Sequence, residues 1–135
     1  MADKPFHPVK AYRDESFINS HVARPLRILA EYMEPEERFR AERVRDTIVI
    51  FGSARILSAD KATEALQDAE NNNGNFVKAQ KDLKMSRYYE DSRELAHRLT
   101  TWSKSLDRED KRFVICTGGG PGIMEAASRG ASEAR

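Results

Sequence analysis

The sequence predicts an α/β fold of the doubly wound type, preceded by a helical N-terminal extension. Two short apolar runs, at 47–51 and 113–116, have the character of strands in a parallel sheet. Each run leads directly into a loop that contains glycine, and helical patterns follow both loops. The order strand, loop, helix, strand, glycine-rich loop, helix is typical of a doubly wound domain.

Composition narrows the class of protein before any motif is considered. The chain has 135 residues and a mass of 15.4 kDa, so we expect one domain at most. Because its net charge is only +1, we expect neither a nucleic-acid nor a membrane partner. No stretch approaches the roughly 18 apolar residues of a membrane helix, and the N-terminus has no secretory pattern. One cysteine and three separated histidines argue against disulfides and zinc. We expect a cytoplasmic protein without metal or cofactor that acts on small molecules.

The extension, residues 1–45, contains apolar positions at helical spacing between Phe17 and Met33. Pro25 suits the first turn of a helix that begins near Arg24. Pro35 predicts the end of this helix and the start of a second, highly charged one. We interpret the charged stretch as a solvated extension; the alternative is that Arg24 or Arg27 contributes to an anion site.

Residues 46–135 hold the two predicted strands and the helices between them. The strands read TIVIF and FVIC, and continuous apolar runs of this kind indicate burial on both faces. Because a sheet of average size has about 5–6 strands, we expect these two to need neighbours. The segment at about 56–83 is interpreted as an insertion, with a short helix that ends at the Asn-Asn-Asn-Gly-Asn run.

The helix predicted between 84 and 106 has an apolar stripe opposite a charged face. We expect the stripe to pack on the chain's own sheet, although it could instead serve as a partner-binding face. Cys116 precedes the glycines inside an apolar strand, so a packed thiol is expected rather than a nucleophile.

The glycine-rich loop after the second strand carries the strongest functional signal. Glycines let a ligand approach the backbone closely, and the N-terminus of the following helix offers free N–H groups and a partial positive charge. A phosphate is stabilised at such a place. The spacing fits neither G-x-G-x-x-G nor a Walker P-loop, and the simpler alternative is a turn needed only for tight packing. The candidate binding residues of this loop and helix are Gly118, Gly119, Gly120, Pro121, Gly122 and Glu125.

A second, shorter loop follows the first strand at the equivalent place. Ser53 offers a hydroxyl and a backbone N–H, and Arg55 a forked cation suited to phosphate. Ligands of open parallel sheets bind at the carboxyl ends of the strands. We therefore add Gly52, Ser53 and Arg55 to the candidate site.

Three segments of the chain together resemble a known family. TIVIFGSAR, YYEDSRELAHRLT and FVICTGGGPGIMEAASRGASEA are similar to the LOG ("Lonely Guy") proteins, formerly described as lysine decarboxylase-like. The resemblance implies a Rossmann-like nucleotide-binding domain at 46–135, with the helical extension of the longer bacterial members before it. Ser128 stands where the family motif usually has Asn.

The resemblance implies hydrolysis of the N-glycosidic bond of nucleoside 5′-monophosphates, which releases a free base and ribose 5-phosphate. The nucleotide would be AMP-like, and a homo-oligomer is expected. The family's catalytic loop, Pro-Gly-Gly-x-Gly-Thr-x-x-Glu, does not occur in these 135 residues, so we assign no catalytic residue and expect the N-terminal part of a longer enzyme. Two alternatives stay open: a non-catalytic nucleotide-binding or assembly module, and a carrier of molybdenum cofactor.

Overall fold

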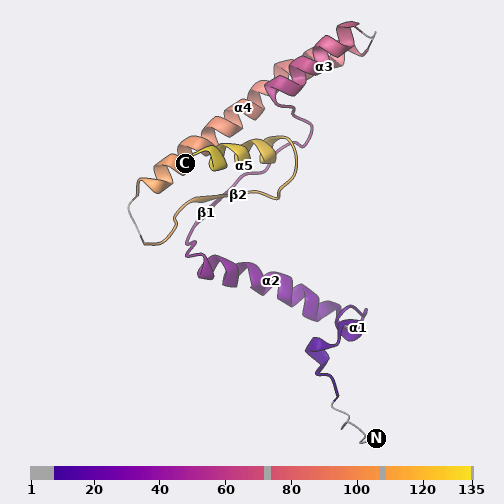
Figure 1. Cartoon of the computed structure of the whole chain (residues 1–135), viewed down its shortest axis with the longest axis vertical. Helices are drawn as coiled ribbons and strands as arrows, with labels where there is room; N and C mark the ends of the chain where they lie inside the picture. Colours follow the sequence, from indigo (N-terminus) through magenta and orange to yellow (C-terminus); the bar gives the residue numbers. More distant parts are fainter. Residues whose placement is uncertain (1–7, 72–73, 107–108, 135) are drawn as a thin grey trace, which may run out of the picture. The chain divides into compact units, whose positions relative to one another are not determined.

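The computed structural model describes residues 8–71, 74–106 and 109–134 and divides the chain into two units, 1–42 and 43–135 (Figure 1). The chain has a mainly helical α/β structure with a small parallel sheet, which confirms the predicted class at this level. The first unit contains η1 (Ala11–Arg13), α1 (Glu15–Ile18) and α2 (Arg24–Ala41). The second contains β1 (Thr47–Val49), α3 (Ala59–Asn71), α4 (Phe76–Lys104), β2 (Val114–Cys116) and α5 (Ile123–Glu133).

Arg27 joins α1 to α2 in the first unit. Its guanidinium donates hydrogen bonds to the carbonyl oxygens of Ile18 at 2.6 Å and Ser20 at 2.7 Å. These carbonyls lie at the end of α1, where helical partners are lacking. Ala23, at the start of α2, is 1% exposed beside this junction. Arg27 therefore has a structural role in this unit.

Pro35 lies inside α2, so the prediction that it ends the helix is wrong. A proline removes one backbone donor, and the rest of the helical ladder continues on both sides of it. Ion pairs at four-residue spacing support the continuation, since Arg38 pairs with Glu34 across Pro35 and Arg40 pairs with Glu36 at 3.1 Å. The two predicted helices are therefore a single one.

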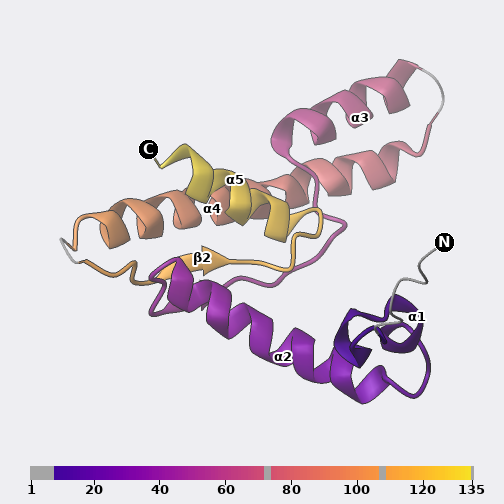
Figure 2. The ribbon, with the colours of Figure 1, turned by 60° about the horizontal axis from the view of Figure 1, so that its bottom comes forward.

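β1 and β2 are parallel neighbours in the sheet of the second unit (Figure 1). Figure 2 shows α4 and α5 beside β2. Ile48 lies opposite Ile115, and the pairing extends beyond the strands through the Ile50 N–H, which donates to the Cys116 carbonyl at 2.9 Å. A connection between parallel neighbours must cross from one end of the sheet to the other. In this chain α3 and α4 make that crossover.

The strands are less buried than their sequences predict. The side chain of Val49 is 52% exposed and that of Phe51 is 77% exposed, while Cys116 is half-buried. Among the described elements, α4 and α5 pack on β2 and not on β1. Much of the apolar surface of β1 is therefore uncovered. The prediction of burial on both faces is therefore wrong for these strands as they stand.

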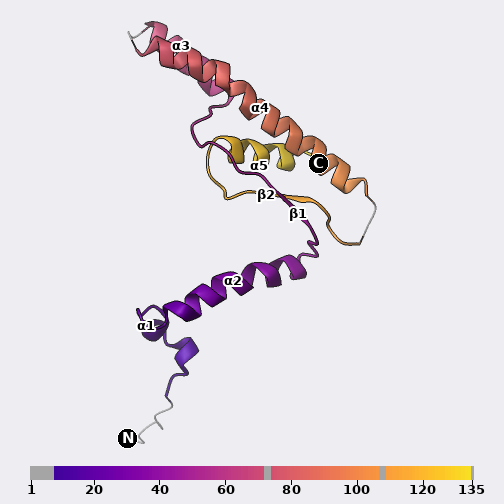
Figure 3. The same cartoon turned by 180° about the vertical axis from the view of Figure 1, so that it is seen from behind.

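α4 begins at Phe76, eight residues before the start predicted from the apolar stripe. The Asn75 side chain accepts a hydrogen bond from the Lys78 N–H at 3.0 Å and so caps the helix. α3 folds back along the first part of α4 (Figure 3). Ala62 of α3 and Ala79 of α4 are both buried. The expected insertion is thus a helical hairpin. Within the described ranges, no helix is both long enough and apolar enough to cross a membrane.

Small residues let α5 pack closely against α4. Ala96 of α4 and Ala126, Ala127 and Gly130 of α5 are all buried. A Cβ atom added at Gly130 would lie 1.9 Å from the carbonyl oxygen of Arg93, so only glycine allows this distance between the helices.

We expect Gly130→Ala to lower the free energy of unfolding by about 1–3 kcal/mol, because its methyl group would collide with the α4 backbone. At an exposed helical site the same change raises stability by up to about 1 kcal/mol. Urea denaturation measures the difference, with Ser132→Ala on the same helix as control. An unfolding free energy equal to or above the wild-type value would contradict the close packing.

Arg93 and Glu133 form a second connection between α4 and α5. The guanidinium donates to both carboxylate oxygens, with Nε and Nη2 each 2.7 Å from its acceptor. The hydrogen bond from Arg93 lowers the pKa of the Glu133 carboxyl below its ordinary value of 4.5. A carboxyl whose pKa is lower in the folded state contributes stability above its unfolded pKa and loses it as pH falls through the folded pKa.

Glu133→Gln should therefore lower the melting temperature at pH 7, and the difference from wild type should shrink as the pH falls below 4.5. Thermal unfolding followed by circular dichroism over this range tests it. Glu64→Gln, which changes an exposed carboxylate on α3, is the control. A difference that does not vary with pH would mean that the ion pair is not formed.

Candidate anion-binding site

The loops that follow β1 and β2 meet at the carboxyl edge of the sheet. The strands are parallel neighbours, so residues 50–55 and 117–122 leave the sheet on the same side. The backbone N–H of Ile123 donates to the carbonyl of Ser53 at 3.2 Å and joins the two loops directly. The structure thus brings together the two segments that the sequence selects.

Gly52 and Gly122 make this contact possible. A Cβ atom at Gly122 would lie 2.2 Å from the Ser53 carbonyl oxygen, and its φ of +74° is one that other residues rarely adopt. A Cβ atom at Gly52 would lie 2.4 Å from the Ile123 side chain. These two glycines therefore serve the packing of one loop on the other, as the simpler interpretation expects.

Gly118 and Gly119 lie instead on the exposed rim of the loop. Gly119 has a φ of +70°, and a Cβ atom built there meets nothing within 4 Å. A Cβ atom at Gly118 would have only an ordinary contact, 3.6 Å, with the Met124 sulfur. Together with the exposed ring of Pro121, these residues leave the backbone of the loop open to a ligand.

Hydroxyl groups hold both loops in shape. The Thr117 hydroxyl oxygen accepts from the Gly119 N–H at 3.2 Å and lies 3.1 Å from the hydroxyl of Ser128. In the other loop, the Ser53 hydroxyl accepts from the Arg55 N–H at 3.2 Å. Thr117 is not among the residues that the sequence pattern selects; its place between the strand and the first glycine is the signal that could have identified it.

The first turn of α5 offers hydrogen-bond donors to a ligand. The Ile123 N–H is used by Ser53, and the Ala126 N–H donates to the Gly122 carbonyl at 2.9 Å. Between them, the N–H groups of Met124 and Glu125 have no hydrogen-bond partner among the described residues. Two unpaired donors at the positive end of a helix are suited to an oxyanion.

Charged residues of both signs belong to the two segments that meet here. Glu125 is half-buried in the first turn of α5, and Arg55 is exposed in the loop after β1, next to Ala54, whose backbone lies against Gly122. A guanidinium adds to the attraction of an anion, and a carboxylate can accept hydrogen bonds from hydroxyl groups. The combination is suited to a ligand that carries both a phosphate and a sugar.

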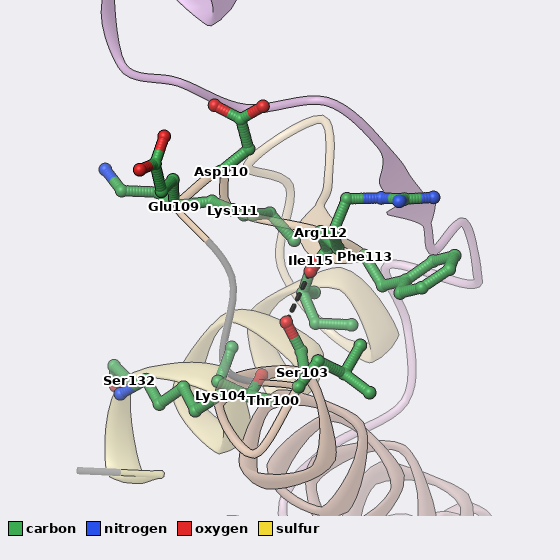
Figure 4. A pocket seen from close by; sticks show the side chains of 13 residues that line it. Thr100, Ser103, Lys104, Glu109, Asp110, Lys111, Arg112, Phe113, Ile115 and Ser132 are labelled. Carbon is green, nitrogen blue, oxygen red and sulfur yellow. Dashed lines mark hydrogen bonds between the residues drawn. The ribbon is translucent and has the colours of Figure 1, made fainter.

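A cavity of about 520 Å³ lies elsewhere, at the amino end of β2 (Figure 4). The end of α4, the segment 109–113 and the end of α5 line it, and the Ser103 hydroxyl donates to the Arg112 carbonyl at its wall. The hydroxyl oxygen of Thr100 is buried there without a hydrogen-bond partner in the described part of the chain. Because open parallel sheets bind ligands at the carboxyl ends of their strands, this cavity is not part of the candidate site.

Comparisons of the chain with known protein families, with curated proteins and with solved structures find no match. Its chemistry must therefore be argued from its own residues. Among these residues, two glycine-containing loops meet at one end of a helix.

Gly122→Ala should separate the two loops, because its methyl group would displace the Ser53 carbonyl and its φ would be strained. We expect hydrogen exchange at the Ile123 amide to quicken by about tenfold or more, since its acceptor would be lost. Gly118→Ala is the matched control, because its Cβ atom has room. Equal exchange rates in the two variants would show that the loops do not meet.

Proposed function

We propose that residues 43–135 form the nucleotide-facing part of a LOG-like hydrolase with a Rossmann-like fold, and that the site binds a nucleoside 5′-monophosphate. The observation that carries this proposal is the pair of unpaired N–H groups, of Met124 and Glu125, beside an exposed glycine loop. The similarity of three sequence segments to the LOG family supports the same proposal. We also propose a cytoplasmic location, because the single cysteine fits a reducing compartment.

The phosphate is held in this proposal by the first turn of α5. Its oxygens accept from the two free N–H groups, and the partial positive charge of the helix end favours the phosphate without any lysine. Gly118 and Gly119 leave the loop backbone open to the phosphate. A Cβ atom at Gly120 would lie 2.5 Å from the Met124 side chain, so Gly120 serves the packing of the loop. Arg55, from the loop after β1, adds a charge-assisted hydrogen bond.

The nucleoside extends from the phosphate over the open edge of the sheet. In this proposal Glu125 accepts hydrogen bonds from the ribose hydroxyls, because it lies in the same helical turn that would hold the phosphate. Ser53 stays engaged in fixing its own loop through the Arg55 N–H. The site therefore selects a ligand that has both phosphate and sugar hydroxyls.

Cleavage of the base–ribose bond needs more than this binding site. Breaking the bond leaves positive charge on the ribose, and the departing base and attacking water need proton transfers. In the LOG family a glutamate of the Pro-Gly-Gly-x-Gly-Thr-x-x-Glu loop is thought to serve this centre. Because these 135 residues do not contain that motif, we expect them to bind AMP without releasing adenine.

Calorimetry with AMP, inorganic phosphate, adenosine and NAD tests the proposal. AMP should bind better than adenosine, because the phosphate supplies the contacts with α5 and Arg55. Arg55→Ala should weaken AMP binding about tenfold, as expected for the loss of one charge-assisted hydrogen bond. Gly119→Ala should weaken it too, because its Cβ atom would enter the open space beside the loop.

Arg98→Ala is the matched control, since it also removes one exposed guanidinium, from a pair with Glu94 on α4. It should leave AMP binding unchanged. Equal affinity for adenosine and AMP, or equal losses in the Arg55 and Arg98 variants, would contradict the site. NAD bound as well as AMP would favour the alternative of a non-catalytic nucleotide-binding module.

A further inference from the structure

The first half of α4 has an exposed stripe of basic and apolar side chains. Its residues recur at intervals of three or four, so at about 100° per residue they share one face of the helix. Ala79, Ser86 and Tyr89, on the opposite face, are buried, and α3 packs along this half of α4 (Figure 2). The α4 outer stripe consists of Val77, Gln80, Lys81, Lys84, Arg87 and Tyr88.

The two lysines of the α4 outer stripe have no acidic partner. No acidic residue lies three or four positions from Lys81 or Lys84, and neither ammonium group is paired within the part of the chain that the structure describes. Outside the stripe such a pair does form, at 2.6 Å between Lys78 and Asp82. Lys84 instead has a cation three positions away on each side, and like charges at this spacing destabilise a helix. A bound anion would remove this repulsion.

Arg87 and Tyr88 form a fixed pair at one end of the stripe. The guanidinium donates to the Tyr88 hydroxyl oxygen at 2.6 Å and lies 4.6 Å from the ring centroid. It keeps its charge and other donors for a partner, and arginine and tyrosine are enriched where proteins contact one another. Val77, at the other end, is 77% exposed. The next position along the same face is acidic, Asp91, and the stripe ends there.

α3 limits how large an anion the stripe can accept. It contains four acidic residues and one lysine, a net charge of −3, whereas residues 76–88 contain four basic residues and one acidic residue, a net charge of +3. Among the described residues, no ion pair joins α3 to α4. An anion that extends beyond the stripe over α3 is therefore repelled, whereas a narrow one is not.

We propose that the α4 outer stripe binds an acidic helical segment of another protein. Two helices in contact repeat their side chains at the same rise of about 5.4 Å per turn, so carboxylates one turn apart on the partner can face Lys81 and Lys84 together. Apolar side chains of the partner cover Val77 and Tyr88, which lie about 16 Å apart along the axis. The complementary charges select the partner and its register.

Nucleic acid and anionic membrane fit the α4 outer stripe less well. Nucleic acids are held through many phosphate contacts, and the stripe offers three cations over a length of about 9 Å. A helix that lies on a membrane needs a continuous apolar face, whereas Val77 and Tyr88 are separated by polar side chains. Both kinds of anion are included as probes in the test.

Fluorescence anisotropy with the full chain tests the proposal. The probe is a labelled synthetic helical peptide with two leucines eleven positions apart and glutamates on the same face between them. We expect it to bind with an affinity that falls as the salt concentration rises, because exposed charges are screened. A peptide with glutamine in place of each glutamate should bind at least about tenfold more weakly.

Charge reversal on α4 tests where the peptide binds. Lys84→Glu should weaken binding of the glutamate peptide at least about tenfold, because an attraction becomes a repulsion. Lys61→Glu is the matched control, since it makes the same change of net charge at an exposed position of α3, and its affinity should stay within about twofold of wild type. Lys81→Glu with Lys84→Glu should instead bind a peptide that has lysine in place of each glutamate. Circular dichroism checks that each variant keeps its helix content.

Equal losses in the Lys84 and Lys61 variants would mean that net charge alone attracts the peptide, and they would overturn the proposal. Tighter binding of a single-stranded oligonucleotide, or of vesicles that contain phosphatidylserine, would overturn it as well. So would a wild-type chain that binds the glutamate peptide no better than the glutamine peptide at about 100 µM.

Discussion

The close contact of α5 with the rest of the second unit is the constraint on which this structure depends. At one end of α5, the lack of a side chain at Gly122 leaves room for the Ser53 carbonyl oxygen, with which any Cβ atom would collide. Two turns further along, Gly130 lets the helix backbone approach that of Arg93 in α4. Because both contacts involve backbone atoms, a clash caused by a larger residue could not be relieved by moving side chains. They fix α5 relative to both the sheet edge and α4.

The candidate site follows from that constraint. With α5 held at both ends, its first turn presents the N–H groups of Met124 and Glu125 at the carboxyl edge of β1 and β2. Thr117 and Ser128 fix the loop that leads to this turn. Donors that are already in place need no reorganisation when an anion binds, which is the physical basis of the proposed nucleotide site.

The sequence predicts which elements the second unit contains better than it predicts the residues at which they begin and end. The strands, the glycine-rich loop and α5 each have a local signal, namely an apolar run or a cluster of glycines. The prediction that Pro35 ends a helix is wrong, because the remaining backbone bonds and the ion pair of Glu34 with Arg38 across Pro35 compensate for one lost donor. α4 starts at Phe76 because Asn75 caps it and α3 packs on it, and packing across a hairpin gives no periodic signal of its own.

By itself, the sequence determined which residues could bind an anion, because glycines and a helix start are local features. It did not determine which glycines pack against a neighbour and which stay open. The tertiary structure decided that, since Gly52 and Gly122 face the opposite loop whereas Gly119 faces open space. It also decided how far the strands are buried, which depends on which helices cover them. A local sequence pattern determines the backbone conformation of a segment and the chemical groups it carries. Which other residues those groups contact depends on how segments far apart in the sequence pack together.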